Sequence, residues 1–224
     1  MENLLPVIEK WTSIRKYKDK VIPDDVLKRI LEAARRAPSW ANTQPWHFIV
    51  VRDKAKKEGL KELAIGQKFL EQADTIVICC GDFSAWQRDK RKKEIIPLWE
   101  ILGRKTDESA INNYLDNPVI NPALRGEKIL LARQYEQLSF AISYMILQAK
   151  HENIGSCIIG GFYNNATGGN LELYKEISKE LNLPEHLLIL TMVTLGYPSE
   201  NPKPRPRKSF ENIVSYEYYG SGNK

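Results

Sequence analysis

Four short apolar runs lie along the chain, and each has the length of a buried strand. Their residues are uncharged, and β-branched side chains are frequent among them, as in strands that a sheet buries. The predicted strands are Phe48–Val51, Thr75–Cys80, Ser156–Ile159 and Leu188–Leu195. Because helical patterns separate these runs, the sequence predicts an α+β domain with a small sheet.

Between the strands, apolar residues recur with helical spacing. In Pro23–Ala37 they form one buried stripe, and Pro23 suits the first position of a helix. From Leu138 to Ala149 the chain is apolar on nearly every side, which predicts a helix that is buried all round. The predicted helices are Leu4–Trp11, Pro23–Ala37, Lys54–Ala73, Ile129–Glu152 and Leu171–Leu181.

Two segments fall outside this alternation. Residues 82–127 combine the charge run Arg88–Glu94 with the turn-rich Asp116–Gly126. We interpret them as an excursion of helices and loop, because they lack the apolar residues for a large core. The chain is therefore expected to form one domain, 1–224. Polar and apolar residues alternate in the tail Ser209–Gly220, so this segment is suited to pair with a surface outside its own core. Another copy of the chain is the natural candidate.

Composition narrows the class of protein. The chain has 224 residues, with 33 Lys and Arg against 28 Asp and Glu, a formal charge of +5. This mild excess suits an anionic ligand and is too diffuse to indicate a nucleic acid. Cys79, Cys80 and Cys157 form no CxxC pair, so we expect a reduced, cytoplasmic protein. No apolar run reaches the ~18 residues of a membrane span, and the N-terminus does not resemble a signal peptide.

The usual signatures of nucleophilic and metal catalysis are missing from the sequence. It has no GxSxG or HExxH motif, and His47, His151 and His186 are scattered, so no metal site is expected. Two basic clusters remain, one near each end of the chain. Guanidinium groups match phosphate oxygens bidentately, so the clusters could converge on one phosphate, or both could be solvated charges. Their members are Ser13, Arg15 and Lys16, and Lys203, Arg205, Arg207 and Lys208.

The loop Ala37–Trp46 follows a predicted helix and precedes a strand, where ligand-binding loops often lie. It carries Ser39, Asn42 and Gln44, which can donate and accept hydrogen bonds at the edge of a planar heterocycle. The alternative is structural, with Asn42 forming a turn. For Trp46 and Phe48, at the end of the loop and just after it, we prefer a place in the core.

Four segments together resemble the nitroreductase family of flavoproteins, in the family's order and spacing. They are TSIRKY at Thr12–Tyr17, APSWANTQPWHFIVV at Ala37–Val51, IGSCIIGGF at Ile154–Phe162 and LGYPSENPKPRPRK at Leu195–Lys208. The resemblance implies a small, mostly antiparallel sheet flanked by helices. It also implies an intertwined homodimer in which the C-terminal tail, 209–224, packs on the partner subunit. The implied cofactor is FMN, bound without a covalent bond at the dimer interface.

The resemblance assigns roles at the phosphate and pyrimidine ends of the cofactor. Ser13, Arg205 and Arg207 match positions that bind the FMN phosphate. Arg15 matches a cation on the pyrimidine side of the flavin ring, where it would stabilise the negative charge of reduced flavin. No other catalytic residue is implied.

Further residues match ring and ribityl contacts. Asn42 and Gln44 would reach the flavin from the partner subunit, and Gln67 lies near a position that supplies a side-chain amide. A strand end would pass one face of the ring, where a backbone N–H approaches it and glycine permits the approach. The remaining matching positions are Pro38 and Ser39 in the loop, and Ile158, Ile159, Gly160 and Gly161 at the strand end.

The sequence departs from the family's pattern in two places. Trp11 and Thr12 stand where many members have Arg followed by Arg or His. One phosphate cation is then missing, so either Arg205 and Arg207, with Lys16 or Lys208, suffice, or FMN binding is weaker by roughly tenfold or more. Trp40 is bulkier than the small residue often found at its position, and it either lies by the flavin or belongs to the core.

The activity that the resemblance implies is that of an FMN-dependent oxidoreductase with a ping-pong mechanism. NADH or NADPH reduces the flavin, and a nitroaromatic, a quinone or a related small electron acceptor then takes its place. Alternatives on the same scaffold are reductive dehalogenation, ene reduction and flavin-consuming chemistry. An alternative from another class is a non-catalytic binder of flavin or nucleotides.

The excursion 82–127 falls where the family is most variable and builds covers over the substrate. As a cover, it would supply pocket residues from its aromatic and basic side chains. As a surface helix pair, it would only carry solvated charges, and this is the preferred interpretation of its charge run. The candidate pocket residues are Trp86, Trp99, Tyr114 and Arg125.

Overall fold

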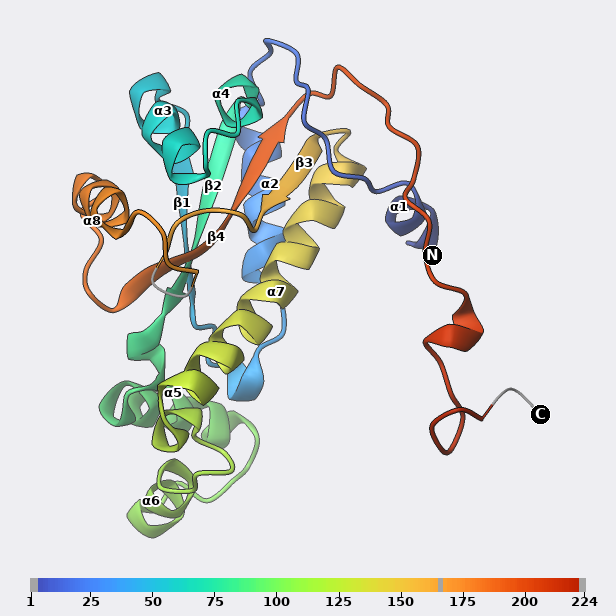
Figure 1. Cartoon of the computed structure of the whole chain (residues 1–224). Coiled ribbons are helices and arrows are strands. Elements are labelled where there is room, and N and C mark those ends of the chain that lie inside the picture. The colour runs from blue at the N-terminus through green and yellow to red at the C-terminus, as the bar shows by residue number, and fades with distance from the viewer. Residues whose placement is uncertain (1–3, 165–166, 222–224) are drawn as a thin grey trace.

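Four strands form a sheet in the computed structural model, which describes residues 4–164 and 167–221. They are β1 (Trp46–Val51), β2 (Thr75–Asp82), β3 (Gly155–Ile159) and β4 (Leu187–Gly196). Their order across the sheet is β1-β2-β4-β3, and every neighbouring pair is antiparallel (Figure 1). The four predicted strands and the antiparallel sheet are confirmed, and β1 and β3 are the edges of this sheet.

Helices cover both faces of the sheet. The helices α2 (Asp24–Arg35) and α7 (Glu127–His151) pack on one face, and α3 (Lys54–Leu63) and α8 (Leu171–Glu180) pack on the other. The helix α7 is the longest of the described chain and runs across the sheet beside α2 (Figure 1). Strands that are covered on both faces need no polar alternation, which explains their unbroken apolar runs.

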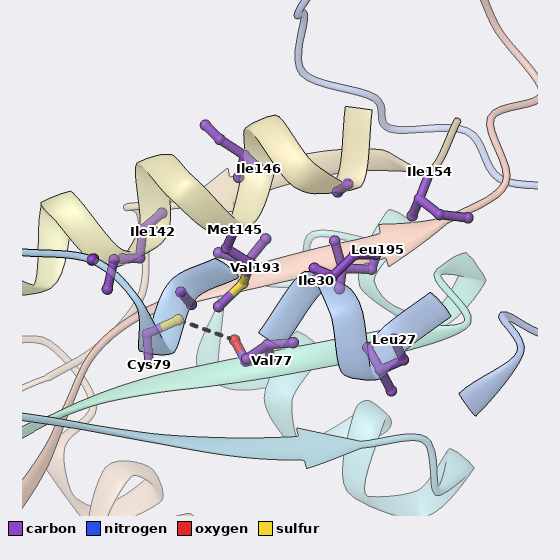
Figure 2. Close-up of a cluster of buried hydrophobic side chains, with 14 of the residues drawn as sticks. Leu27, Ile30, Val77, Cys79, Ile142, Met145, Ile146, Ile154, Val193 and Leu195 are labelled. Atoms are coloured by element: carbon purple, nitrogen blue, oxygen red, sulfur yellow. Dashed lines mark hydrogen bonds between the residues drawn. The ribbon is translucent and has the colours of Figure 1, made fainter. Parts of the chain in front are cut away.

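Alternate residues of β2 supply the two hydrophobic cores. Val77 and Cys79 point toward α2 and α7 and pack with Met145 (Figure 2). Ile78 points the other way and packs with Leu60 of α3. The period of two in a strand thus divides one apolar segment between both sides of the sheet.

One predicted helix is wrong as a single element. Instead of a continuous helix over Lys54–Ala73, the structure has α3 and the short α4 (Phe69–Gln72). The chain breaks between them because Ile65 and Gly66 have φ of 60° and 69°, a left-handed conformation that ends a helix. The predicted Leu4–Trp11 helix is also shorter, since α1 spans Leu5–Glu9.

The excursion contains helices and a small core of its own. Its elements are the 3-10 turn η2 (Phe83–Trp86), α5 (Arg88–Ile101), α6 (Glu108–Leu115) and the 3-10 turn η3 (Pro122–Arg125). Trp99 of α5 contacts Tyr114 of α6 edge to face, with ring centroids 5.0 Å apart. Ile95, Ile111 and Leu115 complete this buried cluster. The two helices therefore pack on each other beyond the end of the sheet (Figure 1).

The C-terminal tail leaves the body of the chain. Beyond β4 it first runs beside the N-terminal segment and then continues away from the sheet, with a short turn η4 (Phe210–Asn212) (Figure 1). Ile213, Tyr218 and Tyr219 are exposed there. The last three positions of the predicted tail, 222–224, lie outside the described residues. None of the described helices combines the length and the hydropathy that crossing a bilayer requires.

Candidate functional site

A pair of glycines lets the N-terminal segment cross the sheet. Gly155 of β3 and Gly196 of β4 face each other in the register. A Cβ at Gly155 would lie 2.9 Å from Cγ1 of Ile14, and one at Gly196 would lie 2.6 Å from Cδ1 of Tyr17. The two glycines therefore provide the space that Ile14 and Tyr17 fill, and both side chains are buried.

Hydrogen bonds tie this segment to β3 and to the start of the tail. Ser13 bridges Ser156, and the Ile14 N–H donates to the Ser156 carbonyl over 2.9 Å. The Glu200 carboxylate accepts from the backbone N–H groups of Arg15 and Lys16 at 2.6 and 3.1 Å. These contacts bring the two ends of the chain side by side.

The two ends enclose a pocket of about 210 Å³. Three arginines, Arg15, Arg205 and Arg207, are among its lining residues. Among the described residues, none of these three arginines makes an ion pair with an acidic side chain, whereas Arg29 and Arg52 do. Three like charges without a carboxylate partner favour an anionic ligand. The full lining is Trp11, Thr12, Ser13, Arg15, Pro202, Arg205 and Arg207.

Trp11 and Thr12, which replace the expected cations, also line this pocket. The Trp11 indole N–H donates to the Ser156 hydroxyl over 3.1 Å, so this side chain braces the N-terminal segment against β3. The positive charge of the described lining therefore comes from Arg15, Arg205 and Arg207.

The other end of β3 opens toward solvent. Gly160 and Gly161 are exposed, and a Cβ at Gly160 would meet no heavy atom within 4 Å. The Gln67 amide donates to the Gly161 carbonyl over 2.9 Å, so the break between α3 and α4 brings Gln67 to this strand end. Ile158 is 40% exposed, but the Ile159 side chain is buried in the core, so only its backbone can face a ligand.

The loop before β1 has a strained backbone. Ala41, Asn42 and Gln44 have φ of 45°, 52° and 47°, in the left-handed region that non-glycine residues rarely adopt. The Ser39 hydroxyl accepts from the Gln44 N–H over 2.9 Å, and the Gln44 amide donates to the Asn42 side chain over 3.1 Å. Such strain often marks a ligand-binding site.

A single copy of the chain does not bring this loop to the arginine pocket. The loop leads into β1, whereas Ser13 bridges Ser156 of β3, and these strands are opposite edges of the sheet. Three strand spacings of about 4.8 Å, roughly 14 Å, separate the two edges. Pro38, Ser39, Asn42 and Gln44 are therefore absent from the pocket's described lining.

The aromatic candidates occupy different environments. Trp40 is 40% exposed and stacks under Arg133, whose guanidinium carbon lies 4.8 Å from the ring centroid, so Trp40 is not a core residue. Trp86 is buried and donates from its indole to Gln134 over 2.6 Å. Trp99 is buried in the small core of the excursion. These two tryptophans are therefore packing residues in this conformation, while Arg125 is exposed.

Sequence reasoning missed the polar residues that hold the strained loop. Gln134 and Gln137 on α7 are buried and bond to its two ends. The available signal was the presence of two glutamines at i and i+3 directly before the all-apolar stretch of that helix.

The buried thiols do not provide a nucleophile. Burial raises the pKa of Cys80 to about 12 and the pKa of Cys79 well above its ordinary value. Burial also raises the pKa of Cys157, although Arg15 and a hydrogen bond from Ser13 oppose this. The three thiols therefore stay protonated near neutral pH. Across residues 4–164 and 167–221, no group of three or more His, Cys, Asp or Glu residues could hold a metal ion.

Comparison with known proteins agrees with the motifs. The model of the "Nitroreductase family" matches residues 8–197. A protein named "NADH dehydrogenase" from Thermus thermophilus is 32% identical over 96% of this chain and 98% of its own length. An "FMN reductase [NAD(P)H]" from Bacillus subtilis is 26% identical over 98% of this chain and 75% of its own.

A solved structure shows the same fold. The putative nitroreductase ydfN from Bacillus subtilis has a TM-score of 0.77 at 23% identity, and the match covers 95% of this chain and 97% of that one. The fold, the four motifs and the family match agree over most of the chain. The chain therefore belongs to the nitroreductase family of oxidoreductases.

Proposed function

We propose that this protein is an FMN-dependent oxidoreductase that uses NADH or NADPH to reduce nitroaromatic compounds, quinones or related small acceptors. The observation that carries the proposal is the pocket of Arg15, Arg205 and Arg207, built from opposite ends of the chain. The names of the relatives, which include NADH, NAD(P)H and FMN, support the same cofactor and reductant.

The residues present fit a phosphorylated flavin. Arg205 and Arg207, which make no ion pair with an acidic side chain in the described chain, suit a phosphate dianion, and Ser13 adds a hydroxyl, while Arg15 is left for the pyrimidine side. Gly160 leaves open space beside a strand end, as close approach of a ring requires. Asn42 and Gln44 supply amides for the polar edge of the ring, and Gln67, whose amide nitrogen donates to Ala64 and Gly161, offers its side-chain oxygen.

FMN held by these residues would supply the redox chemistry, hydride transfer from the nicotinamide and electron transfer to the acceptor in a ping-pong sequence. The chain's own residues bind and orient. Arg205 and Arg207 hold the phosphate, and Arg15 stabilises negative charge on the pyrimidine side. Because the cofactor carries the difficult step, the protein needs neither a thiolate nor a metal.

The site is shared between two copies of the chain. The arginine pocket and the Asn42–Gln44 loop lie at opposite edges of one sheet, which supports a site whose loop comes from a second subunit. Phe140 and Tyr144, four residues apart on α7, are more than 40% exposed and give an apolar face for such a contact.

The tail 209–221 packs on the partner subunit along β1. Ser13 and Ile14 already cover part of the β3 edge, whereas the described chain leaves β1 as a free edge. A groove of about 680 Å³ beside β1, lined by Leu27, Trp46 and Phe48 among others, accommodates the exposed apolar side chains of the tail.

Two further proposals follow from the sequence. The excursion 82–127 covers the substrate, and its small core lets α5 and α6 act as one unit. A cytoplasmic location agrees with the free thiols of Cys79, Cys80 and Cys157.

The test compares Arg207→Ala with Lys208→Ala as a matched control, because Lys208 is a neighbouring exposed cation outside the pocket's lining. Flavin-free protein is titrated with FMN and with riboflavin, which lacks the phosphate. Loss of one charged hydrogen bond raises the Kd for FMN by about ten- to hundredfold in Arg207→Ala. Riboflavin binding and the control variant are unchanged.

The same samples test catalysis. We expect the oxidised flavin spectrum of the parent to bleach anaerobically when NADH or NADPH is added. A parent protein that takes up no FMN refutes the proposal. Uptake of FMN without nicotinamide oxidation identifies a non-catalytic flavin binder, an alternative that the loss of cations at Trp11 and Thr12 favours.

A further inference from the structure

Two buried glutamines on α7 contact the strained loop. Gln134 and Gln137 are 0% and 2% exposed, and they lie one turn apart on the same face of the helix. A buried amide is costly unless its oxygen and nitrogen find hydrogen-bond partners. The hydrogen-bond partners of Gln134 and Gln137 therefore indicate the role of these two side chains.

Both glutamines bond to the loop backbone. The Gln137 side-chain oxygen accepts from the Trp40 N–H over 2.5 Å, and its amide donates to Glu136 over 2.9 Å. The Gln134 amide donates to the Pro45 carbonyl, and its oxygen accepts from the Trp86 indole. The two bonds to the loop backbone fall at its two ends, Trp40 and Pro45.

A glycine in β2 makes room for Gln134. A Cβ at Gly81 would lie 2.6 Å from Cγ and 2.7 Å from Nε2 of Gln134. Gly81 is opposite Trp46 in the strand register, directly after Pro45. The strand thus lacks a side chain at the point where the glutamine passes to the loop.

The loop between these anchors needs external support. Three left-handed residues that are not glycine, Ala41, Asn42 and Gln44, disfavour its conformation in isolation. Arg91 of α5 adds one further bond, to the Ala41 carbonyl over 3.3 Å. Asn42 and Gln44 stand exposed between the anchored ends.

We propose that Gln134 and Gln137 are positioning residues that fix the strained loop so that Asn42 and Gln44 present their amides to the flavin. This inference rests on the proposed function for the identity of the ligand. The two glutamines do not touch the cofactor, and they act through the backbone of residues 40–45.

The first test needs no flavin. Gln137→Met removes the acceptor at similar volume, and Gln148→Met is its control, since Gln148 lies on the same helix and bonds to Glu152. Hydrogen–deuterium exchange of the segment 38–46 in flavin-free protein should be about tenfold faster in Gln137→Met and unchanged in the control. Unchanged exchange in Gln137→Met overturns the proposal.

The second test measures how the bound flavin responds to the same substitution. In FMN-loaded protein, we expect Gln137→Met to alter the visible circular dichroism of the flavin and to raise the FMN Kd about three- to tenfold. Faster loop exchange with an unaltered flavin spectrum refutes the positioning role. If the parent binds no FMN, the proposed function fails, whereas the exchange experiment still decides whether the glutamines hold the loop.

A second, independent variant tests the role of Gln134. A Cβ at Gly81 would displace Gln134 and would also lie 2.7 Å from Cδ1 of the core residue Leu190, while the Gln137 side chain is left unchanged. Gly81→Ala should accelerate exchange in the same segment 38–46, and a variant that folds with parental exchange there contradicts the role of Gln134.

Discussion

Gly160→Ala separates two reasons for a glycine at the end of β3. A Cβ added at Gly160 meets no heavy atom within 4 Å, and its φ lies outside the left-handed region. Neither packing nor backbone conformation therefore requires glycine for folding. Alanine also reduces the entropy of the unfolded chain, so the flavin-free variant should match the parent or exceed its stability by about 0.4–1 kcal/mol.

Ligand binding should change in the opposite direction. If the flavin passes this strand end, the added methyl group occupies its path and separates it from the backbone. A lost hydrogen bond and a steric overlap together cost about 1.5–3 kcal/mol. This cost corresponds to a Kd for FMN that is about ten- to hundredfold higher.

Two measurements on the same preparation decide the matter. Urea denaturation of flavin-free protein gives the free energy of unfolding, and quenching of FMN fluorescence gives the Kd. Gly155→Ala is the control on the same strand, because its Cβ would lie 2.9 Å from Ile14 and should destabilise the fold by about 1–3 kcal/mol. A Gly160→Ala protein that binds FMN as tightly as the parent would show that the strand end does not approach the cofactor.

Two more predictions address stability and assembly. Hydrogen bonding to Arg29 lowers the pKa of Glu152 from 4.5, so this contact stabilises the fold fully above pH 4.5, and the stabilisation is lost below that pH as the pH falls through the lowered pKa of the folded state. Glu152→Gln should flatten this part of the pH–stability curve by less than about 1 kcal/mol, because the pair is partly exposed, and urea titrations at pH 3–7 measure it. For the proposed homodimer, truncation after Lys208 should raise the dissociation constant of the dimer in analytical ultracentrifugation, and an unchanged constant would contradict a contribution of the tail to the interface.

The strands were predictable because a strand that is buried on both faces appears in the sequence as a continuous run of uncharged, mostly apolar residues. Thr75–Cys80 has no charge and alternates its side chains between two cores, so its composition alone indicates a central strand. The helix over Lys54–Ala73 was wrong because its apolar spacing continues through Ile65, where the backbone turns left-handed. Gly66 was the local sequence signal for this break in the helix. The resulting turn brings Gln67 to Gly161.

The strain of the loop had no signal in residue type. In a sequence, left-handed backbone conformations are predicted at glycines. Here Ala41, Asn42 and Gln44 adopt them under the constraint of tertiary contacts. The anchors come from α7, far along the sequence, so local patterns could not reveal them. A motif can thus mark a loop as a candidate ligand contact, whereas only the fold shows which residues hold its shape.

The arginine pocket exists only in the folded chain. In the unfolded state its cations lie near opposite ends of the sequence and are solvated separately. Folding brings Arg15, Arg205 and Arg207 around one cavity without an acidic partner among the described residues, so their mutual repulsion opposes folding there. An anion in the cavity relieves that repulsion and binds the folded state alone, which makes its binding energy part of the stability of the protein. The Ile14–Gly155 and Glu200 contacts, which hold the ends together, are therefore the structural condition for this pocket and for the cofactor binding proposed there.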